Sequence, residues 1–313
     1  MNDATPRQFK GSLLERAAER YELAPPPVLP RTPEPAPVPR ADVPEPLPAA
    51  FAPSPAPVSF APAAPVERRR VAIDRDALRE RGMIVPGAAV TALAEEFRLV
   101  KRQLLLTARV VASDDAERSR TLLVCSARPN DGKTFTAINL ALSLAAERDV
   151  EIVLVDADFA KPDVMATLGL DPGGPGLLDA LADATLDVET LIVDTDVPQL
   201  SLLPAGTRSH SDTELLASAR ARAVLQRLAT ANPRRIVVFD SPPALSASPA
   251  GVLAGHVGQV LLVVRADKTS ESDLREAVAL LDGCENVQLV INSVAFQPGG
   301  RRFGTYYGQE ATQ

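Results

Sequence analysis

The chain has 313 residues, a formal net charge of −7, two cysteines and two histidines. The acidic balance argues against a general nucleic-acid binder, so we expect no nucleic acid among its partners. Prolines interrupt the alanine-rich N-terminal quarter and the other apolar runs are short, so we expect neither a membrane-spanning segment nor a signal peptide. The cysteines and histidines stand apart in the sequence, which predicts no zinc site and no disulfide and fits a reducing cytoplasm.

The first 88 residues lack the pattern of a folded core. Ser12 and Glu15 have the spacing of a capping box, and we predict a short amphipathic helix within residues 1–22. Alone it would be too short to be stable, so it would be either frayed or a docking element for a partner. Residues 23–88 hold more than half of the 29 prolines, mixed with alanine, which predicts a disordered and extended linker.

Between residues 89 and 298, short apolar runs alternate with helical patterns. Runs rich in Val, Leu and Ile without polar alternation are typical of strands buried on both faces. We therefore predict an α/β fold: a doubly wound domain with a mostly parallel sheet. The expected strands cover residues 121–126, 151–156, 199–204, 235–240, 259–266 and 286–294, and the expected helices cover residues 89–108, 132–147, 176–182, 212–229 and 270–283.

A phosphate-binding loop is predicted where a strand, a tight loop ending in Gly132-Lys133-Thr134 and a helix follow one another. This is the arrangement of a P-loop NTPase, in which helix N–H groups and a lysine hold nucleotide phosphates. Ala127 replaces the usual first glycine, and Asn130 is one of the few residue types that tolerate a positive φ. The expected nucleotide-binding residues here are Ala127, Arg128, Pro129, Asn130, Asp131, Gly132, Lys133, Thr134 and Phe135.

Carboxylates lie at the ends of two of the predicted strands: Asp156 ends one and Asp158 follows it, and Asp240 ends another. Because the carboxyl ends of parallel strands meet at one edge of a sheet, these side chains should lie beside the phosphate loop. Carboxylates beside a triphosphate would repel it unless a hard cation lay between them. The sequence therefore implies Mg²⁺ together with the nucleotide.

These motifs carry a family resemblance. The phosphate loop and residues 153–158 and 236–243 resemble the Walker A, A′ and B motifs of the bacterial tyrosine kinases that regulate exopolysaccharide synthesis. The resemblance covers roughly residues 89–296 and is strongest to the tyrosine autokinases found with exosortase-linked systems. It implies an ATP-dependent protein tyrosine autokinase.

The resemblance also implies roles for single residues. Lys133 would grip the β- and γ-phosphates of ATP, and Asp156 would take the proton from a tyrosine hydroxyl. Asn292, at the end of the last predicted strand, would lie near the adenine. The residues implied as Mg²⁺ ligands, directly or through water, are Thr134, Asp158 and Asp240.

Glu95, Arg98 and Lys101 match the Glu-x-x-Arg-x-x-Arg pattern by which family members assemble into rings. Lysine cannot reproduce the forked guanidinium of arginine, so the third contact would be weaker. The alternative is an ordinary charged helix face that points to solvent.

Residues 299–313 are predicted to form a flexible tail that holds Tyr306 and Tyr307, two of the three tyrosines of the chain. The last predicted strand ends at the active-site edge of the sheet. About a dozen extended residues reach roughly 40 Å, enough to enter the site of a neighbouring subunit. By resemblance, these tyrosines would be phospho-acceptors.

The resemblance further implies a partner, the cytoplasmic part of a membrane polysaccharide chain-length (co-polymerase) protein, and hence a location peripheral to the inner membrane. An alternative function is a P-loop ATPase switch of the partitioning or positioning type. Those ATPases carry a signature lysine early in the loop, where this chain has Arg128, so the sequence favours the kinase. A third alternative, a scaffold that binds nucleotide without turnover, is disfavoured by the intact Lys133, Asp158 and Asp240.

Overall fold

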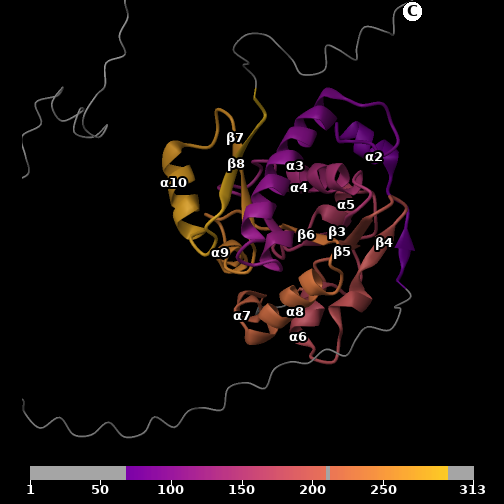
Figure 1. Cartoon of the computed structure of the whole chain (residues 1–313), viewed down its shortest axis with the longest axis vertical. Helices are drawn as coiled ribbons and strands as arrows, with labels where there is room; N and C mark the ends of the chain where they lie inside the picture. The colour runs from indigo at the N-terminus through magenta and orange to yellow at the C-terminus, as the bar shows by residue number, and fades with distance from the viewer. Residues whose placement is uncertain (1–67, 209–211, 295–313) are drawn as a thin grey trace, which may run out of the picture. The chain divides into compact units, whose positions relative to one another are not determined.

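A computed structural model describes residues 68–208 and 212–294. In this part of the chain, one eight-stranded sheet has the order β1-β4-β5-β3-β6-β2-β7-β8 (Figure 1). All neighbouring strands are parallel except β4 and β5, which are antiparallel. The predicted α/β fold with a mostly parallel sheet is therefore confirmed.

The strands are β1 (Arg70–Val71), β2 (Thr121–Ser126), β3 (Glu151–Asp156), β4 (Val193–Thr195), β5 (Leu200–Leu203), β6 (Arg235–Asp240), β7 (Gln259–Arg265) and β8 (Val287–Asn292). The α-helices are α2 (Arg75–Glu80), α3 (Ala92–Val111), α4 (Lys133–Ala145), α5 (Val164–Thr167), α6 (Leu177–Ala182), α7 (Asp212–Leu216), α8 (Ala219–Thr230), α9 (Pro249–Ala254) and α10 (Glu271–Leu280). Two 3₁₀-helices lie at Arg118–Arg120 and Val188–Leu191. Within the described ranges, no helix combines the length and the apolar character needed to span a membrane.

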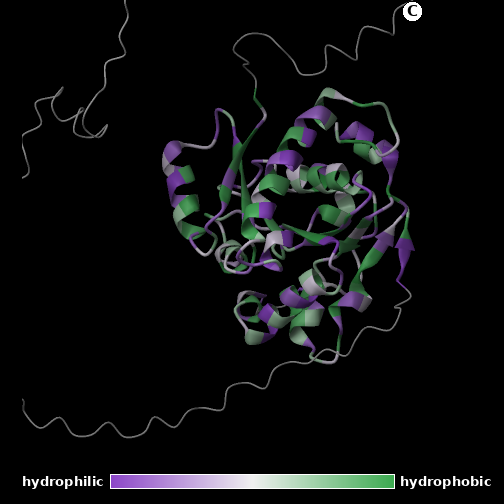
Figure 2. Ribbon diagram, in the orientation of Figure 1, coloured by the Kyte–Doolittle hydropathy of each residue, from purple (hydrophilic) through white to green (hydrophobic). Residues whose placement is uncertain are grey.

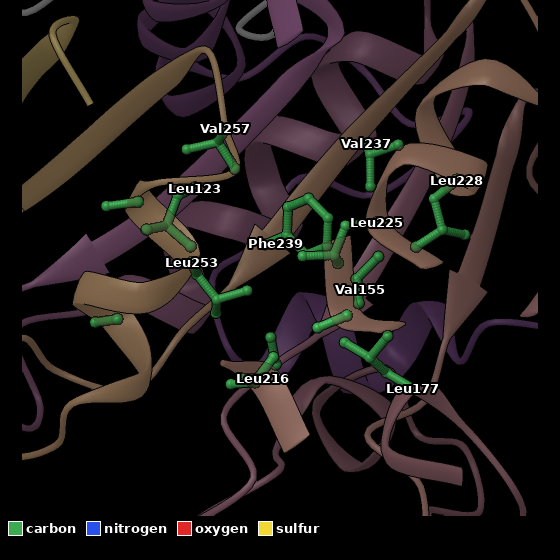
Figure 3. Close-up of a cluster of buried hydrophobic side chains, with 14 of the residues drawn as sticks. Leu123, Val155, Leu177, Leu216, Leu225, Leu228, Val237, Phe239, Leu253 and Val257 are labelled. Atoms are coloured by element: carbon green, nitrogen blue, oxygen red, sulfur yellow. The ribbon is translucent and has the colours of Figure 1, made fainter. Parts of the chain in front are cut away.

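Helices cover both faces of the sheet, as a doubly wound fold requires (Figure 1). Helices α2, α3, α4 and α5 pack their apolar side chains on one face. Helices α6 to α10 pack on the other face, where Phe239 of β6 is surrounded by leucines of α8 and α9 (Figure 3). Burying each such side chain contributes on the order of 2 kcal/mol, so both layers hold the sheet rigidly.

Residues 68–88, which the sequence assigns to the linker, form part of the fold. Strand β1 pairs with β4, and Asp74 caps α2 by accepting the N–H groups of Asp76 and Ala77. Leu78 of this helix is fully buried in the core. The linker therefore does not extend to residue 88. A strand of two residues and a helix of six are too short to produce a readable hydrophobic period.

Two predicted helices have different bounds in the structure. Helix α3 begins at Ala92, because Thr91 caps it by accepting the N–H of Ala94. The stretch expected as one helix at 212–229 is divided into α7 and α8, because Ser218 accepts the N–H of Ala221 and starts a new helix. The predicted helix at 1–22, most of the linker and the tail at 299–313 lie outside the described residues.

Candidate nucleotide-binding and catalytic site

The loop between β2 and α4 has the backbone of a phosphate cradle. Asn130 has φ 66° and Gly132 has φ 102°. Asn130 therefore adopts the positive φ that its residue type was expected to tolerate. A Cβ atom at Gly132 would lie 2.1 Å from Nδ2 of Asn292, so this position also requires glycine for space. No described side chain caps the N-terminus of α4, which leaves its first N–H groups for an anion.

The C-terminal part of the sheet holds this loop through side chains that lie far away in the sequence. Two of these side chains, from the end of β7 and from α10, were not anticipated, because only the fold brings them to the loop. The third is that of Asn292, which was expected at the nucleotide. The contacts are Arg128 Nη2 to Asp273 Oδ1 (2.9 Å), Arg265 Nη1 to the carbonyl oxygen of Asn130 (3.0 Å) and Asn292 Nδ2 to the carbonyl oxygen of Asp131 (2.9 Å).

The lysine and hydroxyl of the loop meet the predicted carboxylates. Lys133 Nζ lies 2.7 Å from Asp158 Oδ2, and the Thr134 hydroxyl donates to Asp240 Oδ2 at 2.6 Å. The structure thus brings together four of the residues that the sequence assigned to phosphate and metal binding. In this arrangement the ammonium group of Lys133 is paired with the carboxylate of Asp158.

The donor set fits a Mg²⁺ ion that also contacts phosphate. Oδ1 of Asp240 is buried and has no hydrogen-bond partner among the described residues. Burying an unpaired carboxylate oxygen costs folding free energy unless a cation binds to it. Thr134 and Asp158 lie beside it. Within the described ranges, no group of three or more His, Cys, Asp or Glu is arranged to hold a metal. A metal would therefore need the phosphate oxygens, as Mg²⁺ in nucleotide sites usually does.

Burial changes the protonation of two carboxylates. Removal from water, helped by the mutual repulsion of Asp156 and Asp240, raises the pKa of Asp156 to about 8. Burial also raises the pKa of Asp240 to about 7, although Lys133 and the Thr134 hydroxyl oppose the shift. For Lys133, burial alone would lower the pKa, but Asp240 and Asp158 raise it above its usual value. The neighbouring carboxylates thus favour the charged form of Lys133, while burial favours the protonated form of Asp156.

Asp156, the expected catalytic base, is 1% exposed. Its two carboxylate oxygens accept the backbone N–H groups of Asp158 (3.3 Å) and Val164 (3.0 Å). In this conformation it shapes the turn that follows β3. A tyrosine hydroxyl reaches it only if that turn moves.

A cavity of about 450 Å³ opens beside the loop, a size typical of small-ligand sites. Its lining includes Lys133, Thr134 and Asp158, together with Pro242 from the segment after β6. Lys161 also lines it and was not singled out by the sequence, although its backbone N–H is tied to Asp158. A second cation is thus available near the phosphate position.

Of the residues expected at an oligomer contact, Glu95 and Arg98 pair with each other, and the Arg98 side chain is half exposed. Lys101 is buried and lies inside the fold: Nζ donates to the carbonyl oxygen of Ser143 (3.1 Å) and to Glu147 (2.6 Å). This contradicts the expectation that Lys101 faces a neighbouring subunit. Its stem packs where α3 crosses α4, which spacing along one helix cannot reveal. Tyr306 and Tyr307 lie outside the described residues.

Comparison with known proteins gives consistent matches. A family model described as an AAA domain matches residues 120–292. EpsB of Ralstonia solanacearum is 30% identical over 203 residues, which are 64% of this chain and 26% of EpsB, so the chain spans about a quarter of that relative. Tyrosine-protein kinase YwqD of Bacillus subtilis (strain 168) is 25% identical over 213 residues, 68% of this chain and 85% of YwqD. The solved BceF tyrosine kinase domain is 27% identical with a TM-score of 0.52, covering 63% of this chain and 76% of that one.

Proposed function

The chain belongs to the AAA-domain family and within it to the bacterial tyrosine kinases, and we propose that it is an ATP-dependent protein tyrosine autokinase that regulates exopolysaccharide polymerisation and export. The observation that carries the proposal is the meeting of Lys133, Thr134, Asp158 and the unpartnered oxygen of Asp240 beside one cavity. This set suits phosphoryl transfer, in which most of the catalysis is positioning and charge stabilisation.

In the proposed reaction, the tyrosine hydroxyl oxygen bonds to the γ-phosphorus of ATP, the bond from that phosphorus to the bridging oxygen breaks, and ADP leaves. Lys133 and the N–H groups at the start of α4 hold the β- and γ-phosphates. Thr134, Asp158 and Asp240 would hold Mg²⁺, which neutralises charge on the phosphates. Once the turn after β3 has opened, the ionised carboxylate of Asp156 accepts the proton from the tyrosine hydroxyl.

The proposed acceptors are Tyr306 and Tyr307 of a neighbouring subunit, which makes the reaction a trans-phosphorylation within a ring. The exposed pair of Glu95 and Arg98 remains a candidate ring contact, without Lys101. The proposed activator is the cytoplasmic part of a membrane chain-length protein, which would keep the chain cytoplasmic and peripheral to the inner membrane. These points rest on the family relationship.

Intact-mass spectrometry after incubation with Mg-ATP tests the proposal. The wild type should gain phosphate, and both Lys133→Met and the double variant Tyr306→Phe/Tyr307→Phe should not. The double variant should still hydrolyse ATP, because its site is unchanged. ATP hydrolysis without any phosphate on the wild type, with the membrane activator present, would favour an ATPase switch instead.

A further inference from the structure

Two adjoining hollows lie at the edge of the sheet where β3, β5 and β6 begin. The first, about 1000 Å³, is formed by residues 82–91, the first turns of α3 and the C-terminal end of α4. The second, about 320 Å³, is lined by residues that include Arg70 and Arg148. Both hollows share Arg148 and residues 197–199, so they are continuous. We call them together the basal groove.

The basal groove is remote from the nucleotide site. Glu151, at the start of β3, lines it, whereas Asp156, at the end of the same strand, belongs to the catalytic site. Five residue steps along a strand span roughly 17 Å. An occupant of the groove therefore leaves the phosphate loop open.

The lining of the first hollow is mostly apolar, and Val90 on its edge is 41% exposed. Among the residues that the structure describes, no carboxylate lines this hollow. The loop that carries Val90 turns at Gly82 and Gly87, which have positive φ and open space around them. An apolar segment of another molecule could therefore pack against this hollow without lying next to a carboxylate of its lining.

The charge of the groove is opposite to that of the chain. The chain carries a net charge of −7, yet the described residues that line the two hollows include eight basic side chains and two acidic ones. Most of the basic side chains have ion-pair partners, such as Glu95 for Arg98 and Glu151 for Arg234. Arg70 and Arg148 are exposed and have no ion pair within the described part of the chain. In Figure 2 strand β1, which carries Arg70, has the hydrophilic colour.

We propose that the basal groove is a docking surface for a peptide segment of a partner protein, with an apolar stretch in the first hollow followed by carboxylates that pair with Arg148 and Arg70. Both hollows are concave, and a bilayer surface would instead need apolar side chains that protrude from the protein. An elongated segment with one apolar and one acidic part matches both hollows at once. The proposal does not depend on kinase activity.

The test uses a fluorescent synthetic peptide of about 16 residues whose first half is rich in leucine and whose second half is rich in glutamate. Fluorescence anisotropy with the full chain should show saturable binding. Arg148→Glu and Val90→Asp should each weaken it at least about tenfold, as expected when a close charge pair or an apolar anchor is lost. A twin peptide with lysines in place of glutamates should bind the wild type poorly. The control Arg275→Glu, on the exposed side of α10, should bind the acidic peptide like the wild type.

A fluorescent ATP analogue, bound equally by all variants, establishes that they are folded. Absence of saturable binding of the acidic peptide, or equal binding by Arg148→Glu and the wild type, overturns the proposal. Co-sedimentation with phosphatidylglycerol vesicles that is lost in Arg148→Glu, without peptide binding, also overturns it and assigns the groove to a membrane surface.

Discussion

At the scale of single residues, the register of two strands sets the chemistry of the site. Asp156 and Asp240 are direct partners in the pairing of β3 with β6, so two carboxylates end side by side in a buried place. Burial raises the pKa of both carboxylates; repulsion from Asp240 adds to the shift of Asp156, and repulsion from Asp158 adds to that of Asp240. Without nucleotide, the raised pKa values favour the protonated forms of these carboxylates, because several buried negative charges close together would be unfavourable.

A pH dependence of stability follows. The pKa of Asp240 rises from 3.8 to about 7 on folding, so its favourable contribution is complete below about pH 4 and is lost as the pH rises through 7. Asp240→Asn removes this titration. Without nucleotide, the variant should be more stable than the wild type at pH 8 by roughly 1 to 3 kcal/mol and similar to it at pH 5. The variant should also lose phosphorylation activity.

Urea unfolding at pH 5 and pH 8, without Mg-ATP, measures the effect. Asp282→Asn, an exposed carboxylate, is the control and should follow the wild type at both values. A stability difference between Asp240→Asn and the wild type that does not change with pH would show that Asp240 ionises normally in the folded protein.

At the scale of elements, β7, α10 and β8 act as a clamp on the phosphate loop. Asp273 makes two contacts: one carboxylate oxygen accepts the N–H of Ser270 at the start of α10, and the other accepts a hydrogen bond from the Arg128 guanidinium. Arg265 and Asn292 add contacts from the ends of their strands. The loop conformation is therefore coupled to elements more than 130 residues away.

We predict that Asp273→Asn weakens ATP binding about threefold to tenfold, because a charge-assisted hydrogen bond to the loop is lost. Titration with a fluorescent ATP analogue measures this. Arg128→Gln should cause a similar loss, and the double variant little more, since both remove the same contact. Glu271→Gln, two residues earlier on the exposed face of α10, is the matched control. Additive losses in the double variant would show that the ion pair does not act as one unit.

At the scale of the whole molecule, residues 68–88 are part of the domain and not a tether to it. Ile73, Leu78 and Met83 are buried in the core that α3 and α4 share. Arg75 ties the same segment to Asp196. Residues 68–88 are therefore held in place by the core and do not act as a free linker.

Leu78→Ala should lower the free energy of unfolding by about 2 to 5 kcal/mol, because it leaves a cavity in a closed core. Chemical denaturation of the full chain measures it. Leu99→Ala is the control: that side chain is 51% exposed on α3, and its loss should cost little. A cost for Leu78→Ala no greater than for Leu99→Ala would restore the linker interpretation.

The sequence by itself determined the fold class, the bounds of β2, β3 and β6, and the grouping of Lys133, Thr134, Asp158 and Asp240. Hydrophobic runs, a phosphate-loop motif and carboxylates at strand ends are local signals, and the rule that parallel strands end at one edge brings them together. Only the tertiary structure decided the burial of Lys101, the place of β1 and α2, the hold of Asp273 and Arg265 on the loop, and the raised pKa of Asp156. Each of these depends on which distant side chains meet and how much water they exclude, and no local pattern encodes that.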